Sequence, residues 1–390
     1  MNRIAIACTA IASASLLGSA ALLSAGPLDP PTGSVSSTYK TLSEVEPRIA
    51  LSDTNTPGDA DSVYRISQPG SYYLTGNVIG GAGKSGIQIT SSEVTLDLNG
   101  YRVVGAQGSV HGIAADNASD VTVRNGSVCD WDAHGLWLSN VTRACVEDVS
   151  SVRNASSGIW VGSLGAVRRC TVDATQEGIV AGEGSSISEC RVSHCIGDGI
   201  YGHGQSLVSS CIVQGCATGV LAGGNGTIVQ GCSVTESSYG ITILGMNSVL
   251  NCQVSSNSTG IDAPGQGSLI EDCTAVGNTG SGIRVANDCI VRRNHCRNNV
   301  WTGNGIHVTG TNNRIEDNHC ASNNRGLHVA GSGNFIVRNA CSDNTTDWVF
   351  AANNVFGRIR DRRSPGSPPV NGFDAPDSLG AAEANANFSY

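Results

Sequence analysis

The stretch from Val167 to Cys273 reads VRRC, ISEC, VSSC, VQGC, VLNC and IEDC at steps of 20 or 21 residues, and it decides the fold. Each of these six short runs ends in a cysteine, and the six cysteines are equivalent: Cys170, Cys190, Cys211, Cys232, Cys252 and Cys273. The same place is then taken by Asn294, Asn318 and Asn339, and toward the N-terminus it falls near Asp148, Asn125 and Asn99. A period of this length is typical of a solenoid in which each repeat is one turn.

A second column of residues supports the same period, because a glycine followed by an aliphatic residue recurs in twelve units of 20 to 26 residues. These glycines are Gly86, Gly112, Gly135, Gly158, Gly178, Gly199, Gly219, Gly240, Gly260, Gly282, Gly305 and Gly326. Each unit holds two or three short runs of alternating apolar residues, and none has ten residues of helical periodicity. We therefore predict an all-β protein, a right-handed parallel β-helix of about twelve coils.

Stacking equivalent residues ~4.8 Å apart would place cysteine or asparagine in one inward column. Asparagine amides there can bond to the coils above and below, and cysteine can fill the same space as a small apolar residue. The chain has 15 cysteines, but stacked side chains that point the same way fit a disulfide poorly. We expect mostly buried free thiols, with Cys195 and Cys216 as the pair most open to oxidation.

The ends of the chain differ from the repeats. Residues 1–25 are predicted to be a signal peptide, because an apolar run follows Arg3 and ends in small residues; an uncleaved membrane anchor is the alternative. Residues 26–60 would be a linker and N-terminal cap, 61–357 the β-helix domain, and 358–390 a flexible C-terminal tail. The expected location is secreted, periplasmic or at the cell surface, with no membrane contact after cleavage of the signal peptide.

The charge balance argues against a nucleic-acid partner. The formal net charge is −9, and the 23 lysines and arginines are scattered along the chain rather than clustered. The sequence contains no cluster of basic residues that could bind along a phosphate backbone.

The Gly-Ile-x-Val runs, the asparagine places and the opening PGSYYL at 69–74 resemble the pectate lyase-like superfamily of right-handed β-helices, specifically the parallel β-helix repeat proteins. The six cysteines depart from that family's asparagine ladder. The resemblance implies the fold, and it implies that the Gly-Ile-x-Val sheet lines a substrate cleft. It leaves the activity open, because the family includes lyases, hydrolases, epimerases, tailspikes and adhesins.

On this sheet, the outward residue two after each glycine is the place to look for a site. Its column reads Gln88, Ala114, Trp137, Trp160, Val180, Tyr201, Leu221, Thr242, Asp262, Arg284, His307 and His328. Trp137, Trp160 and Tyr201, with Asp132 and His134 close by, are predicted to bind a sugar chain, since rings stack on pyranose faces while polar groups bond hydroxyls. The alternative is that these rings only cover the sheet.

Catalytic candidates are less specific. Glu177 and Asp198 lie at equivalent places of neighbouring coils, as a pair of hydrolytic carboxylates would. In a lyase, Arg284 could remove a proton while Asp262 held Ca²⁺. His307 and His328, one coil apart, could supply two of the ligands of a transition metal. The alternative for this half of the column is a solvated polar face.

The sequence thus favours a secreted protein that binds, and in one version cleaves, a polysaccharide at the Gly-Ile-x-Val face. An enzyme of this kind would be a polysaccharide lyase or a glycoside hydrolase, with Ca²⁺ as the cofactor to test. The alternatives are a non-catalytic surface structural or adhesion module, and metal handling through the two histidines. The oligomeric state is not predicted.

Overall fold

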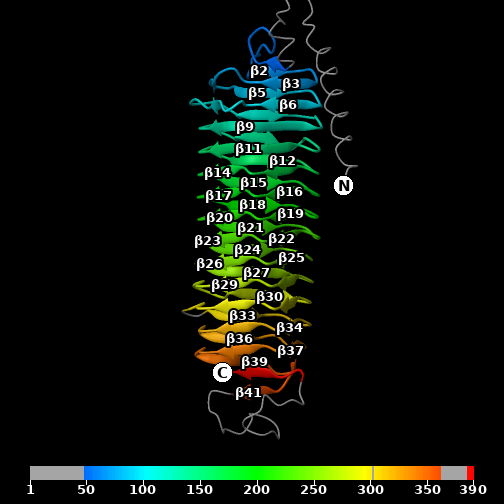
Figure 1. The fold of residues 1–390 in the computed structure, drawn as a ribbon, viewed down its shortest axis with the longest axis vertical. Helices are drawn as coiled ribbons and strands as arrows, with labels where there is room; N and C mark the ends of the chain where they lie inside the picture. The colour runs from blue at the N-terminus through cyan, green and yellow to red at the C-terminus, as the bar shows by residue number, and fades with distance from the viewer. Residues whose placement is uncertain (1–47, 301–302, 362–383) are drawn as a thin grey trace, which may run out of the picture. The chain divides into compact units, whose positions relative to one another are not determined.

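The structure is a computed structural model that describes residues 48–300, 303–361 and 384–390. The predicted signal peptide and most of the predicted linker lie outside these ranges. Every regular element within them is a β-strand, and the strands stack coil upon coil (Figure 1). None of the described residues forms a helix that could cross a membrane.

Two parallel sheets form the walls of the solenoid. The first contributes one strand to each coil and has fourteen strands: β2 (Ser62–Ile66), β5 (Ser85–Ile89), β8 (Ile113–Ala115), β10 (Leu136–Leu138), β12 (Ser157–Val161), β15 (Glu177–Ala181), β18 (Asp198–Gly202), β21 (Thr218–Ala222), β24 (Tyr239–Ile243), β27 (Thr259–Gln266), β30 (Ile283–Asn287), β33 (Asn304–Val308), β36 (Arg325–Val329) and β39 (Thr346–Phe350). We call it the fourteen-stranded sheet.

The second, which we call the large sheet, has 28 strands and contributes two strands to a typical coil, one on each side of a corner. Its strands are β1 (Ile49–Ala50), β3 (Gly70–Tyr73), β4 (Val78–Ile79), β6 (Val94–Asp97), β7 (Arg102–Val104), β9 (Val121–Cys129), β11 (Cys145–Val152), β13 (Ala166–Arg168), β14 (Thr171–Asp173), β16 (Ser186–Ser188), β17 (Arg191–Ser193), β19 (Leu207–Ser209), β20 (Ile212–Gln214), β22 (Ile228–Gln230), β23 (Ser233–Thr235), β25 (Ser248–Leu250), β26 (Gln253–Ser255), β28 (Leu269–Glu271), β29 (Thr274–Val276), β31 (Ile290–Arg292), β32 (His295–Arg297), β34 (Arg314–Glu316), β35 (His319–Ala321), β37 (Phe335–Val337), β38 (Ala340–Ser342), β40 (Val355–Phe356), β41 (Ile359–Asp361) and β42 (Asn387–Ser389).

The predicted all-β parallel β-helix is confirmed, with about 15 turns where the sequence predicted about twelve coils. Most of this small difference has a simple origin. The twelve glycine-bearing units each supply a strand of the fourteen-stranded sheet, and β2 and β39 extend that sheet at its two ends without the glycine signature.

Most corners of the coils are made by a residue in the left-handed region followed by an inward residue. In the coil after β15, the left-handed residues are Gly184 (φ 69°), Glu189 (φ 56°) and His194 (φ 52°). Such φ values are uncommon outside glycine. The strain recurs at every coil because the next residue must point inward, as Cys190 and Cys195 do.

The predicted cysteine and asparagine column is buried along its length, from Cys170 to Asn339. Where asparagine fills it, each amide bridges coils: the Asn294 N–H and Nδ2 donate to Asn318 Oδ1, both at 3.0 Å. All fourteen cysteines in the described part of the chain are free thiols, and Cys145 alone among them is half-buried rather than buried.

Two further ladders, absent from the sequence analysis, stand at the other two corners. One contains Asn257, Asn278, Asn299, Asn323 and Asn344, and the other contains Cys289, Asn313, Asn334 and Asn354. Left-handed corner residues also pair between coils through ion pairs, as Arg293 does with Asp272 at 2.9 Å. Polar bonding between coils therefore runs up all three corners.

The C-terminal end differs from the predicted flexible tail at 358–390. Strand β41 lies within it, and β42 pairs in parallel with both β38 and β41. Asn387 of β42 continues the first ladder, because its Oδ1 accepts the N–H of Asn339 at 2.9 Å. Residues 362–383 of this segment lie outside the described residues.

Candidate functional site

The outward column predicted on the fourteen-stranded sheet exists in register. Trp137 pairs with Trp160, which pairs with Val180, which pairs with Tyr201. Asp262, Arg284, His307 and His328 follow one another in the same way along β27, β30, β33 and β36. The residues on either side of each are buried core residues, so this column is the outer surface of the sheet.

An aromatic cluster lies at the N-terminal half of the column. It combines Trp137 and Trp160 of the column with His111 and His134, which stand one residue before Gly112 and Gly135. The His134 ring lies 4.1 Å from that of Trp137, and the two indoles meet edge to face at 4.9 Å. His111 stacks on Trp137 at 5.7 Å. All four side chains are half-buried rather than buried, so part of each ring stays open to solvent.

The two imidazoles of the aromatic cluster are held neutral and in one tautomer. His134 Nδ1 accepts the backbone N–H of Ser157 at 3.1 Å, and His111 Nδ1 accepts that of His134 at 3.4 Å. Burial lowers the pKa of both rings, that of His134 to about 4, with the neighbouring His111 adding to the effect. The remaining proton is therefore on Nε2, which makes each ring a hydrogen-bond donor and a poor metal ligand.

His111 was missed by the sequence analysis. It stands one residue before Gly112, at the place that His134 occupies before Gly135. That repetition was the available signal. Asp132, predicted to bind substrate, is exposed, and its carboxylate accepts the Gly108 N–H at 2.5 Å, so it also holds the loop between β7 and β8.

Tyr201 stands apart from the aromatic cluster, because Val180 occupies the intervening coil. Its ring stacks on His203 at 4.2 Å and lies over Gly223, where a β-carbon would come within 2.7 Å of the ring. A groove of about 550 Å³ opens beside this pair and is lined mainly by polar residues, among them Glu183, Gln205 and Asn225. The Tyr201 region is thus a second, separate contact area on the same face.

Glu177, on β15, lies in the coil between these two areas, and Asp198, on β18, lies in the same coil as Tyr201. Glu177 Oε2 accepts the Asp198 N–H at 2.9 Å, and its carboxylate lies over Gly197, where a β-carbon would be 2.4 Å from Oε1. Both side chains are half-buried, and burial raises the pKa of each. A raised pKa makes a carboxylate a better candidate for giving and taking a proton.

The polar half of the column begins with an ion pair. Arg284 Nε and Nη2 bind the two oxygens of Asp262, each at 2.6 Å, and Asp262 is 4% exposed. This contact raises the pKa of Arg284, which stays protonated. The pair does not favour the lyase interpretation, because Arg284 is a poor base in this state and both Asp262 oxygens are already engaged.

His307 and His328 stack in parallel, with ring centroids 4.6 Å apart and planes 4° apart. Burial lowers the pKa of both, and His328 and Arg284 help to lower that of His307 to about 4. In the described ranges, no group of three or more His, Cys, Asp or Glu residues could hold a metal ion. The two histidines therefore form a neutral, hydrogen-bonding surface beside Arg325 and the buried Asn304, whose Oδ1 has no partner.

The fold is similar to that of several solved structures. Among solved structures, the A-module of the mannuronan C-5 epimerase AlgE4 from Azotobacter vinelandii superposes with a TM-score of 0.54 at 14% identity, over 74% of this chain and 91% of that one. A tailspike protein of E. coli bacteriophage HK620 superposes with a TM-score of 0.50 at 13% identity, over 80% of this chain and 69% of that one. At these identities the likeness shows the fold alone.

The sequence itself has no match among curated proteins. A family model described as a right handed beta helix region matches residues 60–205 and 198–345, which together make up most of the chain. With its two parallel sheets and laddered corners, the protein belongs to the right-handed β-helix family.

Proposed function

We propose that this protein binds a polysaccharide along the outer face of the fourteen-stranded sheet. The observation that carries the proposal is the aromatic cluster, in which two indoles and two imidazoles are half-buried on the outer face of the fourteen-stranded sheet. Exposed ring faces pack against the apolar faces of sugar rings, and the two Nε2–H groups can donate to hydroxyls.

The spacing of the contact areas supports a chain rather than a single sugar. Trp160 and Tyr201 are two coils apart, so the aromatic cluster and the Tyr201 area are separated by about 10 Å. Glu177 lies in the intervening coil and Asp198 in the coil of Tyr201, and we place both within reach of the same chain. One solved structure with this fold is named as a mannuronan C-5 epimerase, which is consistent with a polysaccharide ligand.

Affinity electrophoresis tests the binding proposal. The protein is run in native gels that each contain one acidic or neutral polysaccharide, and binding slows its migration. We expect Trp137→Ala and Trp160→Ala to weaken the binding at least about tenfold, a loss that matches about 1.4 kcal/mol of ring contact. Tyr390→Ala is the matched control, since Tyr390 is an exposed aromatic residue outside the fourteen-stranded sheet. Equal retention of both tryptophan variants and wild type would remove the proposal.

For catalysis, Glu177 and Asp198 are the residues that we propose as the acid and base. Their raised pKa values and their place beside the two contact areas support this role. Glu177→Gln and Asp198→Asn should each abolish turnover of a bound polysaccharide, measured as new reducing ends or unsaturated ends, while leaving gel retention within about twofold. If wild-type protein binds without any turnover, the protein is a non-catalytic binding or adhesion module instead.

We also propose that the protein is exported. Residues 1–25 have the composition of a signal peptide, although they lie outside the described residues. N-terminal sequencing of protein recovered outside the cytoplasm should begin between Ala20 and Gly26. An intact Met1 on all recovered protein would contradict export by this route.

A further inference from the structure

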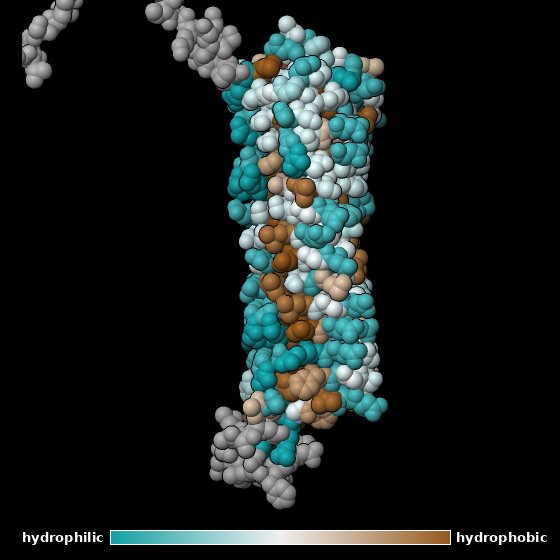
Figure 2. Space-filling view, turned by 90° about the vertical axis from the view of Figure 1, so that its right-hand side faces the viewer, coloured by the Kyte–Doolittle hydropathy of each residue, from teal (hydrophilic) through white to brown (hydrophobic). Residues whose placement is uncertain are grey.

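The large sheet has an outward row of eight residues, one from each of eight successive coils, that is largely apolar. We call it the apolar row; it consists of Leu207, Ile228, Ser248, Leu269, Ile290, Arg314, Phe335 and Val355. Five of the six apolar members are at least 38% exposed, and Leu269 is half-buried. Figure 2 shows the resulting hydrophobic band running down this face toward the C-terminal coils.

An exposed apolar band of this length is unusual on a monomeric soluble protein and marks an interaction surface. The row spans seven steps of ~4.8 Å, about 34 Å in all. Toward the N-terminus it ends at Ser186 and Ala166, which are small, and toward the C-terminus it ends at β40, the last strand paired in this part of the sheet.

The order of the row identifies the partner. It reads apolar, apolar, Ser248, apolar, apolar, Arg314, apolar, apolar, and so has the same polarity read from either end. When two copies pack antiparallel about a two-fold axis, the first residue of one row lies opposite the last residue of the other row, the second opposite the second last, and so on. Two antiparallel rows would therefore match Leu269 with Ile290, Ile228 with Phe335, Leu207 with Val355, and Ser248 with Arg314.

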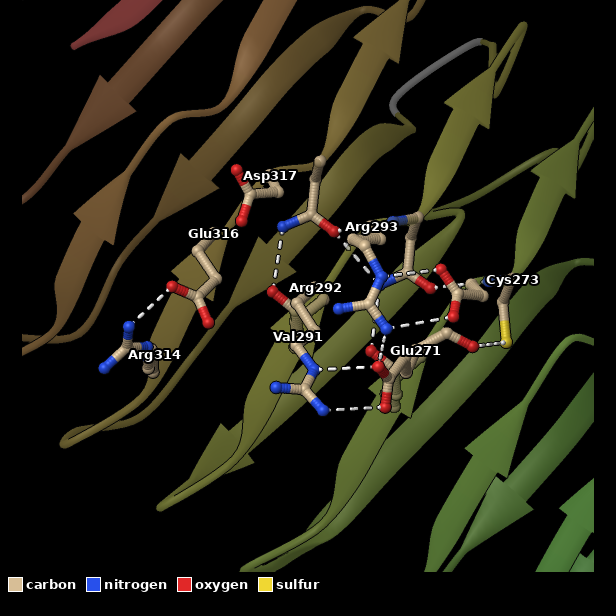
Figure 3. Close-up of polar contacts among 12 residues, drawn as sticks. Glu271, Cys273, Val291, Arg292, Arg293, Arg314, Glu316 and Asp317 are labelled. Atoms are coloured by element: carbon tan, nitrogen blue, oxygen red, sulfur yellow. Dashed lines mark hydrogen bonds and ion pairs between the residues drawn. The ribbon is translucent and has the colours of Figure 1, made fainter. Parts of the chain in front are cut away.

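Arg314 suits such an interface. Its Nη2 binds Glu316 Oε2 at 2.7 Å, and its guanidinium lies over the Phe335 ring at 5.6 Å (Figure 3 for the ion pair). The charge is thus compensated within the same chain, and the group can donate to a serine hydroxyl across the interface without leaving an unpaired buried charge.

The row itself supplies the length of the contact, about 34 Å. Most strands of this wall are three residues long, about 10 Å, so a specific interface of at least about 1,200 Å² in total also includes residues at the two adjoining corners. The flanking charges do not oppose it, since Glu271 is paired with Arg292 at 3.0 Å (Figure 3).

We propose that the apolar row is a homodimer interface in which a second copy of this chain packs antiparallel about a two-fold axis between Leu269 and Ile290. This surface lies on the large sheet and is separate from the proposed polysaccharide face, so the two proposals stand or fall independently.

Sedimentation equilibrium of the full chain tests the proposal. Wild type should be a dimer at micromolar concentration, and Leu269→Arg should raise the dimer Kd at least about tenfold, since it places two like charges near the axis. The antiparallel match makes a sharper prediction: Ser248→Asp should tighten the dimer by facing Arg314 of the other copy, and Ser248→Arg should weaken it. Ile212→Arg is the matched control, because Ile212 is 44% exposed on β20 outside the row.

Cross-linking fixes the orientation. On a Cys145→Ser background, the double variant Leu207→Cys/Val355→Cys should give a covalent dimer with a short bismaleimide, while neither single variant should. The two positions are about 34 Å apart within one chain, too far for an internal link. Covalent dimers from the single variants would indicate parallel rows. A wild-type monomer at every concentration up to about 100 µM, or a dimer unaffected by Leu269→Arg and by both Ser248 changes, would also overturn the proposal.

Discussion

Replacing Asn318 with alanine tests the corner ladders that hold successive coils together. The Asn318 side chain is buried and makes four hydrogen bonds. Its Nδ2 donates to Val291 O and Asn339 Oδ1, each at 2.9 Å, and its Oδ1 accepts the N–H and the Nδ2 of Asn294, each at 3.0 Å. The variant leaves the Asn294 N–H without an acceptor and deprives the Val291 carbonyl of a donor.

Each buried backbone group left unsatisfied costs about 1–3 kcal/mol, so we expect Asn318→Ala to lower the free energy of unfolding by about 4 kcal/mol. Asn318→Cys should cost roughly half as much, because the thiol at the equivalent position, Cys273, donates to the carbonyl of the preceding coil, Val249 O, at 3.5 Å and so can replace the bond to Val291 O. Gln253→Ala, an exposed change on β26, should stay within about 0.5 kcal/mol of wild type.

Urea unfolding followed by circular dichroism gives the stability loss, and hydrogen exchange resolved to single amides gives its location. The Asn294 amide should lose protection in Asn318→Ala before the amides of distant coils do, since each coil contacts mainly its neighbours. A loss below about 1 kcal/mol with an unchanged Asn294 amide would refute the reasoning.

Two further predictions concern charges on the fourteen-stranded sheet. The pKa of His134 is about 4 in the folded protein, against 6.5 for an unperturbed histidine, so the unfolded chain binds more protons between these values. The free energy of unfolding should therefore fall as the pH drops from 6.5 toward 4. Urea titrations at about pH 7 and about pH 4.5 should show a smaller fall for His134→Gln than for wild type. Equal falls would contradict the assignment. Arg284→Ala removes both bonds to the buried Asp262 and should cost about 2 kcal/mol, less than the about 3–5 kcal/mol of a fully buried pair because Arg284 is 40% exposed. In a double-mutant cycle, Asp262→Ala/Arg284→Ala should cost less than the sum of the single changes, and strict additivity would show that the pair does not interact.

The fold and the composition of the column could be predicted from the sequence because one repeat length governs both. Once Cys170 and Cys190 are known to stack, every other position stacks with them, and alternation decides which side chains face out. That reasoning placed Trp137 beside Trp160 and Asp262 beside Arg284, and the register confirms both neighbours.

Two of the missed features were visible in the repeat, and one was not. His111 stands one coil before His134 at the equivalent place, although spacing alone does not determine that its ring stacks on Trp137. The ladder at Asn299, Asn323 and Asn344 was visible as an asparagine five residues after each first-ladder asparagine, but it was not used. Strand β42 was hidden because Asn387 stacks on a residue 48 positions away, where the other steps are about 21.

The ion pair of Asp262 and Arg284 shows a further limit. The sequence placed opposite charges side by side but could not tell a solvated face from a bidentate contact. Two hydrogen bonds of 2.6 Å and the burial of Asp262 change the chemistry expected there, because Arg284 and Asp262 bind each other and not a ligand.

The most direct test of the polysaccharide proposal is a crystal structure with an oligosaccharide prepared from the polysaccharide that retards the protein most in affinity gels. The sugar rings should lie on Trp137 and Trp160 and run past Glu177 toward Tyr201. A well-ordered oligosaccharide on the large sheet or at a corner, with Trp137 and Trp160 untouched, would contradict the proposal.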